Sequence, residues 1–197
     1  MAPAAAVIEP NLRAAPRRAI EHGVFAMLLL VFAEVMLFSG LLSAYLIARA
    51  SALPGTWPPP DQPLLPFAST AINTLALLAS GALLWRAHVA FRKDEATATR
   101  LTGWALALGV FFVAFQGVEW ARLLAQGLTL TSSKLGAFFY TMVGAHALHA
   151  VAAILGLGWV WLQMRAGRVT RSAFGAAQVF WYFVVLLWPV LFLLLYR

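Results

Sequence analysis

Long uninterrupted apolar runs dominate the pattern of hydrophobic and polar positions along this chain. Five runs are each long enough for a helix that crosses a bilayer, which needs about 20 apolar residues. Short polar or proline-rich segments separate the runs, which cover approximately residues 21–50, 66–91, 101–124, 136–164 and 174–196. The pattern predicts an all-α fold, a polytopic membrane bundle of five transmembrane helices forming one domain over residues 21–197. The charged segment 92–100 is expected to be a loop.

The lysine and arginine residues fall unequally on the two sides of this predicted bundle. Four lie on one side, namely Arg49, Arg122, Lys134 and Arg197. Ten lie on the other, namely Arg13, Arg17, Arg18, Arg86, Arg92, Lys93, Arg100, Arg165, Arg168 and Arg171. Because positively charged loops stay in the cytoplasm, the bias predicts a cytoplasmic N-terminus and a C-terminus outside. Residues 1–20 are expected to be a cytoplasmic tail before a retained helix, since the following run exceeds the about 7–15 apolar residues of a signal peptide.

Composition narrows the function classes. Hydrophobic residues make up 62% of the chain and charged residues 11%, against about a quarter charged in soluble domains. The chain has no cysteine, which excludes disulfides, thiolate metal sites and a cysteine nucleophile within it. The net charge of +7 is attributed to topology and anionic lipid, so membrane lipids are expected partners and nucleic acid is not.

Four ionisable residues lie inside the predicted spans: Glu34, Glu119, His146 and His149. Such a group costs about 3 kcal/mol on insertion scales, so each needs a partner or a function. Glu34 and His146 are both predicted near the bilayer midplane, where they can meet. Two interpretations of Glu34 stay open: a protonated carboxyl bonded to a neighbouring helix, and a group that exchanges protons or contacts a ligand.

The two histidines are three residues apart and share a helix face. A metal or haem site is disfavoured because the spans hold no matched set of further ligands. The favoured interpretation is hydrogen bonding between helices, including to Glu34, and a proton or lipid contact is the alternative. Glu119 is expected to be an anchor near the outer interface, paired with Arg122 or with a residue of another subunit.

Small and amide residues predict close helix packing. Asn73, Ser80 and Gly81 lie on the second span, where Asn73 is expected to hydrogen-bond across to another helix. Gly144 is the corresponding small residue on the fourth span. The aromatic run 180–183 is assigned to lipid contact or packing.

Four motifs in chain order resemble subunit III of the haem–copper oxidases, the cytochrome c oxidase subunit III family. The resemblance covers roughly residues 25–197. The motifs are an acidic helix from Glu34 to Tyr45, Asn73-Thr74 with Ser80-Gly81, Gln116 to Glu119-Trp120, and Gly144 with His146 and His149. Two positions depart from the family, in which Trp-His-Phe-Val-Asp is common, because this chain has Tyr182 for the histidine and Val185 for the aspartate. The five spans are typical of the short bacterial form.

The resemblance implies a non-catalytic accessory subunit of a terminal oxidase in the bacterial cytoplasmic membrane. Haem and copper are then held by the catalytic subunit I, against which this chain packs, and no cofactor other than phospholipid is expected here. The implied role is to support proton uptake and stability during aerobic respiration. Alternatives are a partner of a quinol oxidase or a nitric oxide reductase, and a small proton-coupled transporter that uses Glu34 and His149 as a relay.

Overall fold

The computed structural model describes residues 22–53, 55–59 and 63–196. Within these ranges the chain is all-α, and its helices are α1 (His22–Ala50), α2 (Phe67–Ala90), α3 (Glu95–Ala125), α4 (Lys134–Arg165) and α5 (Arg171–Leu195). All five are long and apolar enough to cross a membrane, which confirms the predicted fold class. The predicted tail over residues 1–20 lies outside the described residues.

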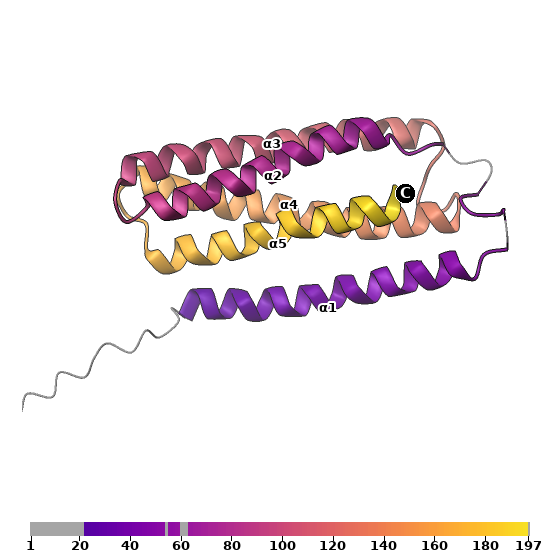
Figure 1. Ribbon diagram of the computed structural model, residues 1–197, viewed down its shortest axis with the longest axis horizontal. Coiled ribbons are helices and arrows are strands. Elements are labelled where there is room, and N and C mark those ends of the chain that lie inside the picture. The colour runs from indigo at the N-terminus through magenta and orange to yellow at the C-terminus, as the bar shows by residue number, and fades with distance from the viewer. Residues whose placement is uncertain (1–21, 54, 60–62, 197) are drawn as a thin grey trace, which may run out of the picture.

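The helices run side by side along one axis (Figure 1). α2 packs along α3 and α4 packs along α5, while α1 lies against α5 and α4. The buried core lies mainly among α2 to α5, and α1 contributes only Phe38 and Tyr45 to it. Most of the apolar surface of α1 is therefore exposed, as suits a helix that faces lipid or another subunit.

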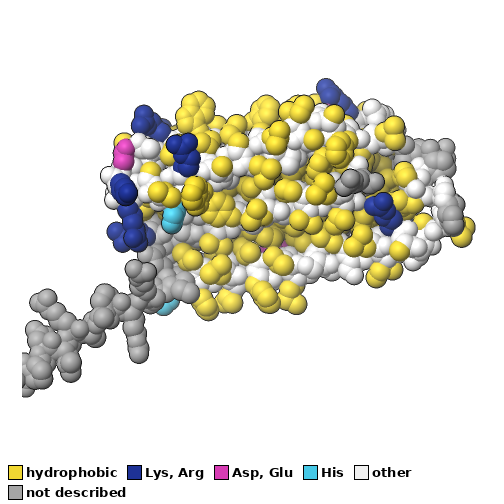
Figure 2. All heavy atoms as spheres, in the orientation of Figure 1, with side chains coloured by type: hydrophobic (Ala, Val, Ile, Leu, Met, Phe, Trp, Pro, Cys, Tyr) yellow, Lys and Arg dark blue, Asp and Glu magenta, His cyan; other side chains and the backbone are white. Residues whose placement is uncertain are grey.

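Lysine and arginine lie towards the ends of the bundle, and apolar side chains cover most of its middle (Figure 2). On the face drawn in Figure 2, lysine and arginine gather mostly at the end where α1 begins, and hydrophobic side chains form a broad band between the two ends. This is the distribution expected of a bundle whose middle is surrounded by hydrocarbon.

The third helix begins earlier than the sequence pattern predicts. Its first residue is Glu95, so the segment Glu95–Arg100 is helical and the predicted loop over residues 92–100 is too long. Asp94 explains the early start because its side chain accepts a hydrogen bond from the Thr97 N–H at 3.0 Å and caps the helix. Hydrogen bonds from the Thr97 hydroxyl and N–H lower the pKa of this carboxyl below its usual value. Charged residues can thus extend a membrane helix beyond its apolar span when a cap is present.

Two glycines allow α5 to approach its neighbours closely. A Cβ atom at Gly109 of α3 would collide with the ring of Trp181, which is itself only 2% exposed. A Cβ at Gly81 of α2 would lie 3.0 Å from a methyl group of Val185. The absence of a side chain at these positions therefore lets bulky α5 residues enter the core.

Candidate functional site

Glu34 of α1 and His149 of α4 form an ion-pair contact between the two helices. Their Oε2 and Nε2 atoms lie 3.1 Å apart, and the two side chains are 20% and 15% exposed. Three aromatic rings surround the histidine, those of Phe38, Phe180 and Phe183, with ring centroids 5.5–6.1 Å away. The carboxyl and the imidazole thus meet in a largely apolar setting.

The contact of the second ring nitrogen of His149 limits the protonation states that the pair can adopt. Nδ1 lies 2.7 Å from the carbonyl oxygen of Ala145. A carbonyl can only accept, so Nδ1 must carry a hydrogen. Nε2 and Oε2 lie at ion-pair distance but without the geometry of a hydrogen bond, and one proton can be shared between them in two forms, a neutral carboxyl with imidazole or a carboxylate with imidazolium. Both forms have no net charge, which suits a membrane interior.

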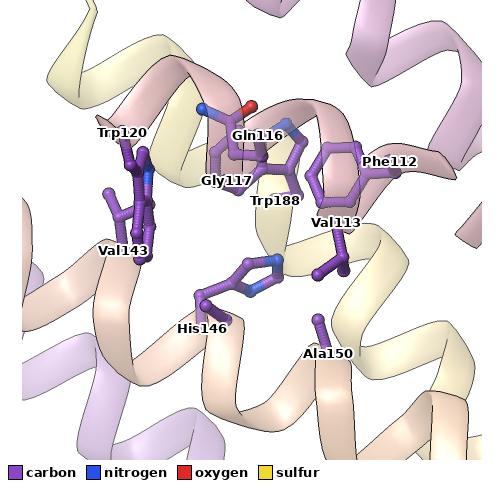
Figure 3. A pocket seen from close by; sticks show the side chains of 10 residues that line it. Phe112, Val113, Gln116, Gly117, Trp120, Val143, His146, Ala150 and Trp188 are labelled. Atoms are coloured by element: carbon purple, nitrogen blue, oxygen red, sulfur yellow. The ribbon is translucent and has the colours of Figure 1, made fainter. Parts of the chain in front are cut away.

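His146 does not join Glu34, although the sequence placed both near the same depth. Its ring lies 5.1 Å from that of Trp188, and the side chain is 1% exposed. Figure 3 shows it projecting from α4 into a cavity beneath α3. The cavity has a volume of about 90 Å³ and is lined by residues of α3, α4 and α5. The two histidines therefore contact different helices: His149 contacts α1, and His146 lies beside α3 and α5.

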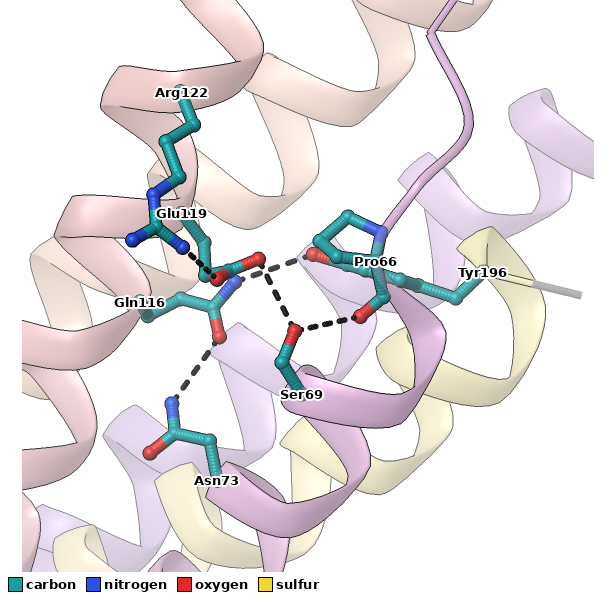
Figure 4. A network of polar contacts seen from close by, with 7 residues as sticks. All are labelled: Pro66, Ser69, Asn73, Gln116, Glu119, Arg122 and Tyr196. Carbon is teal, nitrogen blue, oxygen red and sulfur yellow. Dashed lines mark hydrogen bonds and ion pairs between the residues drawn. The ribbon is translucent and has the colours of Figure 1, made fainter.

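A polar network joins α2, α3 and the C-terminal end of the chain (Figure 4). The Asn73 amide donates to the Phe112 carbonyl at 3.1 Å and to Oε1 of Gln116 at 3.3 Å. Gln116 in turn donates from Nε2 to the hydroxyl oxygen of Tyr196 at 3.2 Å. Asn73 thus bonds across to α3, and the network continues to the end of α5.

Glu119 lies beside this network with two partners of its own. It is 4% exposed, and one oxygen lies 3.2 Å from Nη1 of Arg122. Its other oxygen accepts from the Ser69 hydroxyl at 3.3 Å. Because the side chain of Arg122 is 67% exposed, the ion pair lies at the edge of the protein. Glu119 therefore links α3 to the start of α2.

The small residues predicted for packing have different surroundings. The Ser80 hydroxyl donates to the Ala105 carbonyl at 2.8 Å and accepts from the Trp181 indole at 3.1 Å. Gly81 faces Val185 as described above. By contrast, a Cβ at Gly144 would meet nothing within 4 Å. An added methyl group at Gly144 would thus have open space, and the packing role expected of this glycine stays a prediction.

The sequence reasoning missed several residues of these contacts. Trp181 was grouped with a run assigned to lipid or packing, yet it is buried and hydrogen-bonded to Ser80. Trp188 likewise donates to the Thr74 hydroxyl at 2.9 Å. A buried tryptophan usually needs an acceptor for its indole N–H. Tryptophans on one span together with serine and threonine on another are therefore the sequence signal for such contacts.

The two departures from the family motif lie at different places on α5. Val185 is 3% exposed and packs against Gly81, so this departure places an apolar residue in the core. The hydroxyl oxygen of Tyr182 is buried and has no hydrogen-bond partner among the described residues.

Across the described ranges, no three histidine, cysteine or acidic side chains are grouped closely enough to hold a metal ion. Several of the polar side chains instead pair with one another between helices, among them Glu34 with His149 and Asn73 with Gln116. Fold and contacts together define the class of this molecule: a polytopic membrane protein whose intramembrane polar groups join its helices.

Comparison with known proteins identifies the family within that class. The model of the family described as cytochrome c oxidase subunit III matches residues 5–197, and the chain belongs to this family. It is 34% identical over 178 residues to cytochrome c oxidase subunit 3 of a Synechocystis species, covering 88% of this chain and 74% of that protein. It is 35% identical over 184 residues to the subunit 3 protein of Thermostichus vulcanus, covering 89% of each. A probable subunit 3 of Nocardia farcinica is 31% identical over 169 residues, 83% of this chain and 81% of that protein.

Proposed function

We propose that this chain is the non-catalytic accessory subunit III of a terminal haem–copper oxidase, the complex that reduces oxygen to water and pumps protons in aerobic respiration. The observation that carries the proposal is the family match over residues 5–197. The helix-to-helix pairing of Glu34, Asn73 and Glu119 supports a structural role for these residues.

The catalytic subunit I is the proposed neighbour within that complex, and the bacterial cytoplasmic membrane is the proposed location. The cytoplasmic side is assigned to the end where α1 begins, in line with the distribution of lysine and arginine. The exposed apolar surface of α1 and α4, which includes Met36 at 62% and Leu148 at 71%, is available to subunit I or to phospholipid. Haem and copper belong to the neighbouring subunit in this proposal.

Affinity purification from native membranes tests the assembly. A tag on this chain is expected to recover a multispan partner with the reduced-minus-oxidised absorbance of haem, and intersubunit cross-links from introduced cysteines are expected to reach that partner. Cysteine labelling is specific because the natural chain has none. Recovery of the chain without haem would overturn the proposal.

Turnover tests the accessory role. An oxidase that lacks this chain is expected to keep its haem spectrum and its initial oxygen reduction, but to lose activity faster over repeated turnovers. Oxygen uptake by the recovered complex distinguishes an oxidase from a nitric oxide reductase. Proton or solute movement in liposomes that contain this chain alone would favour the transporter alternative instead.

A further inference from the structure

His146 lines the cavity among α3, α4 and α5 with its hydrogen-bonding capacity unused. Among the residues that the structure describes, neither Nδ1 nor Nε2 has a partner, although the side chain is 99% buried. A neutral imidazole carries one donor and one acceptor. Hydrocarbon offers no partner for either, and an unpaired polar group in an apolar setting is costly. The ring therefore needs a ligand that both donates and accepts hydrogen bonds.

A second polar group on the same cavity has the same need. The indole nitrogen of Trp120 is buried and also lacks a partner within the described ranges. Trp120 lines the cavity from α3, while His146 enters it from α4 (Figure 3). Two unsatisfied side chains from different helices thus border one space.

The neighbouring polar side chains already make hydrogen bonds to groups other than His146. Gln116 accepts from Asn73 and donates to Tyr196, so turning its amide towards His146 would break both contacts. The indole of Trp188, which lies beside the His146 ring, donates to Thr74. A rearrangement within the protein therefore does not satisfy His146 without leaving another buried group unpaired.

We propose that the cavity is a water-binding site in which His146 and Trp120 hold water within the membrane span. Its volume of about 90 Å³ available to water centres is several times the roughly 10–15 Å³ that one water needs. Water supplies both the donor and the acceptor that the imidazole needs, and an acceptor for the indole. The walls are otherwise apolar, among them Phe112, Val113 and Val143, so the polar contacts of the water come from His146 and Trp120.

A high-resolution cryo-EM map of the chain in its native assembly, in nanodiscs, tests the site directly. Compact density is expected within hydrogen-bonding distance of an imidazole nitrogen of His146, and it should be absent in His146→Leu. A cavity without density, or elongated density typical of an acyl chain, would overturn the proposal.

The sign of the change in Tm of the same assembly, measured for variants of the cavity, gives an independent test. If the cavity holds water, His146→Leu removes its main ligand and Ala150→Val displaces it, so each variant lowers Tm. The double variant is expected to regain part of that loss, because leucine needs no water and fills the space beside valine. A dry cavity predicts that both single variants raise Tm. Simple overcrowding by valine predicts that the double variant is the least stable of the three, and either result would refute the inference.

Discussion

The contact between Glu34 and His149 makes a quantitative prediction about how α1 is held. Glu34→Leu leaves Nε2 of His149 without a partner, and His149→Leu leaves the carboxyl unpaired in the same way. An unsatisfied buried polar group costs about 1–3 kcal/mol. Couplings measured between polar side chains of membrane helices average about 0.6 kcal/mol and reach about 1.7. Since both side chains are partly accessible, at 20% and 15%, we expect a coupling of about 1 kcal/mol, or about fivefold in an equilibrium constant.

A double-mutant cycle separates this coupling from the other contacts of the two residues. Each single variant and the double variant are unfolded in mixed micelles and followed by tryptophan fluorescence, for which the chain has eight tryptophans. The contacts of His149 with Phe38 and Phe183 are lost in both variants that lack the imidazole, so they cancel in the cycle. Single effects that simply add in the double variant would refute the contact as an energetic link.

Glu34→Gln identifies where the shared proton lies. Because Nδ1 of His149 is engaged with the Ala145 carbonyl, a neutral ring presents Nε2 as an acceptor. The glutamine amide can donate to that acceptor, so the variant should be nearly as stable as the natural chain if the pair is neutral. A loss as large as that of Glu34→Leu would show that the glutamine amide does not replace the carboxyl as a partner of Nε2.

Three further predictions concern other positions. Gly109→Ala places a methyl group against Trp181 and should cost about 1–3 kcal/mol of stability by thermal unfolding, whereas Gly156→Ala, where a Cβ meets nothing within 4 Å, should not destabilise. Asp94 has a lowered pKa, so its cap on α3 is fully present above pH 3.8 and is lost as the pH falls through the lower folded value. Amide exchange over residues 95–98 should rise at that pH in the natural chain and should not change there in Asp94→Asn. Labelling by a hydrophobic carbodiimide should disappear in Glu34→Gln with haem content intact, and loss of haem would show that the carboxyl is needed for assembly.

The sequence predicted the helices well because bilayer thickness sets the length of an apolar run. The predicted start of α3 was wrong because the helix extends beyond the apolar span at its N-terminal end. Asp94 starts the helix ahead of the span by accepting hydrogen bonds from the N–H and the hydroxyl of Thr97. The cap was visible in the sequence, since aspartate before Glu95 and Thr97 is typical of a helix N-terminus.

The partners of the intramembrane histidines could not be predicted in the same way. Residues three apart share a face but still point about 60° apart around a helix axis, at about 100° per residue. α4 contacts three other helices, so this angle is enough to direct His149 towards α1 and His146 towards α3 and α5. Which helix each ring meets depends on helix rotation and crossing, and a single sequence contains no direct record of either.

The unequal attachment of the helices gives the carboxyl of Glu34 a physical role. α1 buries only Phe38 and Tyr45. Among the described residues, its polar contacts to other helices are the Glu34–His149 pair and the hydrogen bond from the Tyr45 hydroxyl to the Leu194 carbonyl at 3.1 Å. Apolar surface gives little preference between a neighbouring helix and lipid, because hydrocarbon solvates leucine as well as protein does. A polar pair has no such alternative in the bilayer, so it favours the packed position of α1 even though its burial is costly. The cost of placing glutamate in the membrane is therefore offset by fixing the helix that is otherwise least attached to the bundle.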